Sequence, residues 1–297
     1  MKKRNSRKLI LVCVIFLFSG CKAVQKTEMP EASIQKEEQG ETSDTEEVRA
    51  VFTEEAIGTE GIGEGNVQGE AGTEVKGQTE GGADASGEAY DYVAFGNSVT
   101  CSRVAEGLWW GNWGMAATSA EKDYIHLISK WLQTRTKQPV KTMVLDIKKW
   151  EVAKDRDAAL SEYQDHLGAQ TDLVTIQTGE NIKSKETLDM DYLNLIKLIK
   201  EKAPNAQILM LGELLWPAED IEAAKLAACE AYGVTFVDME EYLNGYNEFY
   251  RSKIGTKVFG EDGKKHTIVD EAVAAHPNDE GMACIAKQVI EQITVQN

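Results

Sequence analysis

Positive charge, cysteine and long apolar runs are all scarce in this chain. Its 297 residues include 32 Lys and Arg against 49 Asp and Glu, and the net charge of −17 argues against nucleic acid or an anionic surface as a partner. In the segment 91–297 the cysteines are Cys101, Cys229 and Cys284, an odd number whose spacing gives no metal pattern. The apolar run at 9–18 is too short to span a bilayer, so no transmembrane helix is expected there.

The first 21 residues are typical of a signal sequence and not of a folded element. A positively charged stretch precedes the apolar run, which ends in Phe18-Ser19-Gly20-Cys21. This ending is similar to a bacterial lipoprotein signal, in which the cysteine is lipidated, except that Phe18 stands where leucine is usual. We therefore expect Cys21 to anchor the chain to the extracellular face of the cell membrane. The alternative is an ordinary secretory signal with a chance cysteine.

Residues 22–90 have the composition of a linker. Acidic residues far outnumber basic ones, glycine recurs, and Phe52 is the only aromatic residue of the segment before Tyr90. Such a stretch cannot bury enough apolar surface to offset the entropy lost on ordering. We expect a disordered, acidic tether. The remaining residues, 91–297, are long enough for one domain with a substantial core.

Apolar runs alternate with helical patterns through this domain. The runs predict buried strands at 92–95, 142–147, 173–178, 207–211 and 234–237. The helical patterns lie at about 119–136, 158–166, 185–202, 217–232 and 279–293. This alternation predicts an α/β fold, a three-layer α/β/α sandwich around a flavodoxin-like five-stranded parallel sheet in the order 2-1-3-4-5.

Three short segments carry residues suited to one reaction. They are Gly96-Asn97-Ser98-Val99-Thr100, Gly179-Glu180-Asn181 and His276-Pro277-Asn278-Asp279. A serine can attack once a histidine takes its proton, and an asparagine amide can donate to the oxyanion that forms. Each segment alone has an ordinary explanation as a cap, a turn or a surface histidine. However, the first two follow the first and third strands, which are neighbours in the expected order, so their loops converge.

The order of these segments and their amino-acid sequences resemble those of the SGNH (GDSL-like) hydrolases over about residues 90–295. The resemblance implies hydrolysis of esters through an acyl-serine intermediate, with no metal or organic cofactor. In that scheme Ser98 attacks, and its backbone N–H joins Asn181 in the oxyanion hole. His276 acts as general base and then as general acid.

The chain departs from the family pattern in three places. Asn97 and Val99 replace the aspartate and leucine of the usual Gly-Asp-Ser-Leu. The usual Asp-x-x-His would place an acid at position 273, which is Val273, so Asp270 is assigned as the catalytic acid; Glu271 or a backbone carbonyl are alternatives that could orient His276 instead. The family's separate oxyanion glycine has no clear match in 148–151.

Three tryptophans follow the nucleophile segment. Trp109, Trp110 and Trp113 stand among glycines, as in a platform that binds a sugar ring or an acyl group. A hydrophobic plug over the sheet explains them equally well.

Together these features predict an extracellular, lipid-anchored serine esterase of O-acyl esters. A small-molecule or carbohydrate ester, with acetyl as one candidate acyl group, is the expected substrate. The alternative is a non-catalytic glycan-binding lipoprotein on the same fold. An intact Ser98–His276 hydrogen bond favours the enzyme, and a serine turned away favours binding only. The domain is too short for the two lobes of a solute-binding protein.

Overall fold

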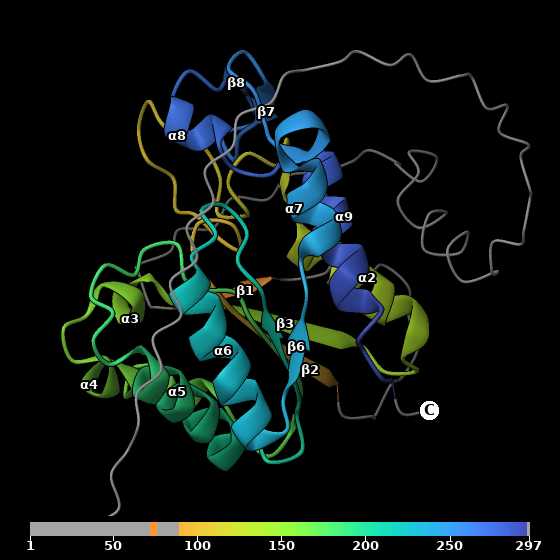
Figure 1. Ribbon diagram of the computed structural model, residues 1–297. Helices are drawn as coiled ribbons and strands as arrows, with labels where there is room; N and C mark the ends of the chain where they lie inside the picture. The colour runs from red at the N-terminus through yellow and green to blue at the C-terminus, as the bar shows by residue number, and fades with distance from the viewer. Residues whose placement is uncertain (1–71, 76–88, 296–297) are drawn as a thin grey trace, which may run out of the picture. The chain divides into compact units, whose positions relative to one another are not determined.

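The computed structural model describes residues 72–75 and 89–295 (Figure 1). The predicted signal at 1–21, with Cys21, and most of the predicted linker lie outside the described residues.

A six-stranded sheet forms the centre of the fold, in the order β1-β3-β2-β4-β5-β6. Five of its strands are parallel to one another: β2 (Tyr90–Gly96), β3 (Val140–Asp146), β4 (Thr171–Ile176), β5 (Gln207–Leu211) and β6 (Thr235–Val237). The predicted five strands and their order are confirmed. The sixth strand, β1 (Gly72–Val75), lies within the predicted linker and pairs antiparallel with β3. It has no apolar run, so the pattern of buried strands missed it.

Helices cover both faces of the sheet (Figure 1). On one face α2 (Tyr124–Arg135) packs beside α9 (Asp279–Ile290), and on the other α5 (Leu188–Lys202) packs beside α6 (Glu219–Tyr232). Strand residues alternate between the two layers. Tyr92 and Ala94 belong to the core under α2 and α9, whereas Val93 and Phe95 belong to the other core.

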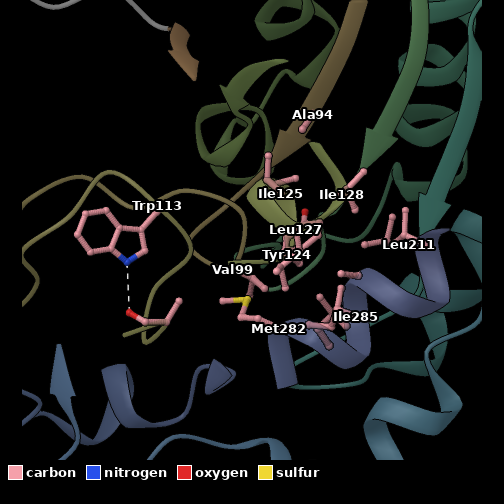
Figure 2. Packing of buried hydrophobic residues seen from close by; sticks show 14 of the residues in the cluster. Ala94, Val99, Trp113, Tyr124, Ile125, Leu127, Ile128, Leu211, Met282 and Ile285 are labelled. Carbon is pink, nitrogen blue, oxygen red and sulfur yellow. Dashed lines mark hydrogen bonds between the residues drawn. The ribbon is translucent and has the colours of Figure 1, made fainter. Parts of the chain in front are cut away.

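The core under α2 and α9 reaches the nucleophile segment. Val99 packs in the same cluster as Tyr124 of α2 and Met282 of α9, as Figure 2 shows. All three side chains are fully buried. The residue that follows Ser98 is therefore held by the core, which limits the movement of the loop.

Shorter elements complete the chain. The predicted helix at 158–166 is two pieces, α4 (Arg156–Leu160) and η2 (Gln164–His166), and the predicted one at 119–136 is divided between η1 (Ala120–Lys122) and α2. The elements not expected from the sequence are α3 (Lys148–Val152), α7 (Glu240–Gly245), η3 (Tyr246–Tyr250), β7 (Lys257–Phe259), β8 (Lys265–Thr267) and α8 (Glu271–Ala274). Within 72–75 and 89–295, no helix has the length and apolar character needed to cross a membrane.

Candidate active site

The nucleophile segment is a tight turn at the carboxyl end of β2. The N–H groups of Thr100 and Cys101 both donate to the carbonyl of Asn97, at 2.9 and 2.8 Å. A side chain at Gly96 would overlap that of Thr100, so only glycine fits before this turn. Ser98 is left half-buried at the tip, where a substrate can approach it.

Ser98 and His276 form a hydrogen bond although 178 positions separate them in sequence. Ser98 Oγ lies 2.8 Å from His276 Nε2, and Nδ1 of the same ring lies 2.8 Å from the carbonyl oxygen of Ala272. Because a carbonyl oxygen can only accept, Nδ1 must carry the proton. Nε2 of the neutral ring is then free to accept the hydroxyl proton of Ser98. The backbone thus fixes the tautomer that a general base requires.

Asp270 does not contact the imidazole, and the structure corrects this assignment. Its carboxylate is the N-cap of α8, where Oδ1 accepts from the N–H groups of Ala272 and Val273 at 2.8 and 3.2 Å. The carbonyl of Ala272 takes the place expected for an acid, which is the backbone alternative left open by the sequence. Val273, where an Asp-x-x-His pattern would place the acid, is buried in the core.

Burial lowers the pKa of His276 from the ordinary 6.5 to about 4, although its backbone hydrogen bonds oppose the shift. A lowered pKa means that the neutral ring, which can accept a proton, prevails at every pH above about 4. We therefore expect kcat/KM for an ester to rise with pH around a midpoint near 4, because this profile reports the free protein's essential base. Acetate release measured by chromatography from pH 3 to 8 tests this, and a midpoint near 6.5 would contradict it.

Each of the two groups expected to bind an oxyanion has an N–H without a hydrogen-bond partner among the described residues. Within the described part of the chain, the backbone N–H of Ser98 donates to no acceptor. Nδ2 of Asn181 donates one of its hydrogens to Glu151 Oε2 at 2.6 Å, and its second hydrogen has no partner among the described residues. Asn181 is half-buried.

A network of buried and half-buried glutamates lies beside these groups. Glu151, from α3, accepts from Asn97, Thr178, Gly179 and Asn181. Burial and the neighbouring Glu180 raise the pKa of Glu151. Burial, aided by Glu213, also raises the pKa of Glu180, although Lys225 opposes the shift. Several carboxyl groups with raised pKa values in one place are typical of functional sites.

Glycine is required at position 179 of this network. Gly179 has a φ of 133°, and a side chain there would overlap the carboxylate of Glu213. Glu213 in turn accepts from the fully buried Lys225 at 2.5 Å. The backbone before Asn181 is therefore constrained on both sides by carboxylates.

The tryptophans do not form the predicted platform. Trp109 and Trp113 are 0% and 5% exposed and belong to the core, as the alternative of a hydrophobic plug requires. Trp113 also donates from Nε1 to the carbonyl of Ala117 at 3.2 Å (Figure 2). Trp110 is half-buried and stacks on His266, with ring centroids 4.5 Å apart. Only Trp110 retains surface that a ligand could contact.

The described residues also contain a cavity away from these groups. A cavity of about 160 Å³ is lined by residues near the starts of β2, β3 and β4, among them Asp91, Lys141 and Thr171. Ser98 follows the other end of β2, so this cavity is separate from the candidate site. No group of three or more His, Cys, Asp or Glu among residues 72–75 and 89–295 could hold a metal ion.

Sequence reasoning missed Glu151 and the role of the Ala272 carbonyl. The stretch 148–151 contains no glycine to match the expected oxyanion position, and its acid has no counterpart in the three motif segments. One signal was available: Glu151 follows the buried strand β3 by only five residues, at the edge of the sheet where Ser98 and Asn181 lie. No sequence pattern identifies a backbone carbonyl as the partner of a histidine.

The fold and site define a three-layer α/β/α protein with a serine–histidine pair at the carboxyl edge of its parallel sheet. Solved structures similar to it include an extracellular lipase from Streptomyces rimosus, at 16% identity and a TM-score of 0.44, covering 69% of this chain and 100% of that one. A Bacteroides uniformis protein described as a GDSL-like lipase has 14% identity and a TM-score of 0.44, covering 69% and 95%.

A third similar structure is a two-domain esterase active on acetylated mannans, at 17% identity and a TM-score of 0.41, covering 68% of this chain and 48% of that one. All three neighbours are lipases or esterases, and at these identities the likeness concerns the fold alone. No family model matches the chain, and neither does any curated protein sequence.

Proposed function

We propose that this protein is a serine ester hydrolase that acts through an acyl-serine intermediate. The observation that carries the proposal is the 2.8 Å hydrogen bond from Ser98 Oγ to His276 Nε2, in a ring whose tautomer the Ala272 carbonyl fixes. A non-catalytic glycan-binding protein has no need of a serine held on the accepting nitrogen of a neutral histidine. The contact therefore favours the enzyme over the binding protein.

The proposed reaction has two halves. Ser98 Oγ attacks the ester carbonyl while His276 Nε2 takes the hydroxyl proton, and the N–H of Ser98 and Nδ2 of Asn181 donate to the oxyanion. The C–O bond to the alcohol then breaks, and His276 returns the proton to the departing oxygen. Water next attacks the acyl-serine by the same route, which releases the acid and restores Ser98.

Hydrolysis of a p-nitrophenyl ester series by the purified full chain tests this function. We expect turnover of the acetate ester that disappears in Ser98→Ala, because Ser98 supplies the hydroxyl that contacts His276 and forms the acyl intermediate. Circular dichroism verifies that the variant is folded. Equal background rates for the two folded proteins would remove the esterase proposal and direct attention to glycan binding.

We propose O-acetyl and other short O-acyl groups on a carbohydrate as the substrate class. Support comes from the expected position at the cell surface and from Trp110, the one tryptophan of the three with exposed surface. The buried Trp109 and Trp113 lend no support. Release of acetate from acetylated polysaccharide, compared with the p-nitrophenyl esters, measures whether a carbohydrate improves kcat/KM.

We also propose that the chain is anchored through a lipid on Cys21, at the extracellular face. The support is the sequence of the first 21 residues. We expect labelled palmitate to be incorporated into the chain when it is produced in a bacterial host, and Cys21→Ser to abolish the incorporation. A Cys21→Ser variant that still takes up the label would contradict lipid anchoring at this cysteine.

A further inference from the structure

Glu151 is a fully buried carboxylate that touches both halves of the candidate site. Oε1 accepts from Asn97 Nδ2 at 3.0 Å, from Thr178 Oγ1 at 2.9 Å and from the N–H of Gly179 at 2.6 Å. Oε2 accepts from Asn181 Nδ2 at 2.6 Å. The side chain is 0% exposed, so these four donors replace the water that a carboxylate would otherwise bind.

Only a carboxylate satisfies this set of neighbours. Every hydrogen-bond partner of the Glu151 carboxylate is a donor, and an ionised carboxylate accepts at both of its oxygens. A glutamine of the same shape accepts at one end and donates at the other. With its oxygen toward the three donors near Oε1, its NH₂ group would face the NH₂ group of Asn181.

The contact decides which end of the Asn181 amide faces the substrate. An asparagine amide can turn by half a rotation with little change of shape, exchanging a donor nitrogen for an acceptor oxygen. A carboxylate on one side attracts the nitrogen, and the second hydrogen of that nitrogen is then available to the oxyanion. An oxygen in this place would repel the negative charge that develops during the reaction.

We propose that Glu151 is the positioning residue of the oxyanion hole, whose carboxylate holds the Asn181 amide with its nitrogen toward the reacting carbonyl. This inference rests on the proposed esterase function. Through Asn97, the residue before Ser98, the same carboxylate also joins the nucleophile turn to the loop that carries Asn181. One side chain thereby sets the spacing between the attacking oxygen and the oxyanion donor.

The test is the steady-state kinetics of Glu151→Gln in the full chain, with p-nitrophenyl acetate as substrate. We expect kcat to fall about 10²-fold, as for the loss of one oxyanion donor, with KM within about twofold. Asp123→Asn is the matched control. It neutralises another fully buried carboxylate, the N-cap of α2, which lies outside the glutamate network and has no contact with Asn181, so kcat should stay within about threefold even if stability falls.

A double-mutant cycle separates positioning from a general structural effect. If Glu151 acts through Asn181, Glu151→Gln should lower kcat no further in an Asn181→Ala background. In the double variant Glu151→Gln with Asn181→Asp, the amide at position 151 can donate to the carboxylate at position 181, so the hydrogen bond is restored with its donor and acceptor exchanged. This pair should recover the thermal unfolding midpoint but not kcat, because an aspartate offers no N–H to the oxyanion.

A ligand-free measurement accompanies the kinetics. The side-chain amide signal of Asn181 in ¹⁵N NMR spectra, assigned with Asn181→Ala, should move in Glu151→Gln and stay in place in Asp123→Asn. Unchanged kcat in a folded Glu151→Gln variant, or losses that add in the cycle, would overturn the proposal while the esterase stands. If instead the wild-type protein hydrolyses no ester, the proposed esterase function is wrong, and so is the oxyanion role of Glu151 that rests on it.

Discussion

Replacing His276 by alanine is expected to lower kcat about 10⁴-fold or more, whereas Asp270→Asn should leave kcat within about threefold. Among the described residues His276 is the one base in contact with Ser98, and loss of a nucleophile's base removes most of the acceleration. Asp270 caps α8 through its side-chain oxygen, which asparagine retains, and it has no contact with the imidazole. The measurement is hydrolysis of p-nitrophenyl acetate by the three folded proteins.

The Asp270→Asn arm is the more informative of the two. In a Ser-His-Asp triad the same substitution costs about 10⁴ in kcat, because the histidine takes the wrong tautomer. Here the Ala272 carbonyl at 2.8 Å fixes the tautomer without a charged group. A loss of 10³-fold or more in a folded Asp270→Asn variant would show that the aspartate reaches His276 during turnover, and our assignment of the backbone carbonyl would be wrong.

The parallel strands could be predicted because the central ones, β2, β4 and β5, are buried on both faces. Such strands are nearly continuous apolar runs, as at 207–211, where the predicted and observed bounds of β5 coincide. The edge strand β1 follows no such rule, since pairing with β3 holds it through the backbone. Short elements such as α3 and α8 were also missed, because one turn of helix carries no periodic pattern.

At the site, topology was predictable and side-chain partners were not. Ser98 and Asn181 follow adjacent strands, which places them at one edge of the sheet whatever the loops do. For Asp270, an acid that caps a helix and an acid that orients a histidine look alike in sequence. The tryptophans had two explanations of equal weight, and only the packing of Trp109 and Trp113 into the core decides between them.

The substitution Asn97→Asp, which would introduce the aspartate of the Gly-Asp-Ser-Leu pattern, is expected to destabilise this protein by about 3 kcal/mol at pH 8. Asn97 is fully buried, and its Nδ2 donates to Glu151 Oε1 at 3.0 Å and to Glu180 Oε2 at 2.6 Å. Aspartate would remove both donated hydrogen bonds and add a third carboxylate to the cluster. The two glutamates therefore require a donor at position 97. This requirement is a physical reason for asparagine in place of the aspartate of Gly-Asp-Ser-Leu.

The sign of the pH dependence makes this prediction specific. Burial raises the pKa of Glu151 and of Glu180, and a third carboxylate raises them further, so the folded variant binds more protons than the unfolded one. Acid then restores stability, because a protonated carboxyl can donate where Asn97 donated. The loss of unfolding free energy in Asn97→Asp therefore shrinks as the pH falls from 8 to 5.

Urea unfolding at pH 8 and at pH 5 measures this loss. Asn244→Asp, at an exposed position, is the charge control and should change little at either pH. An Asn97→Asp variant as stable as the unchanged protein at pH 8 would mean that the two glutamates do not depend on the amide between them.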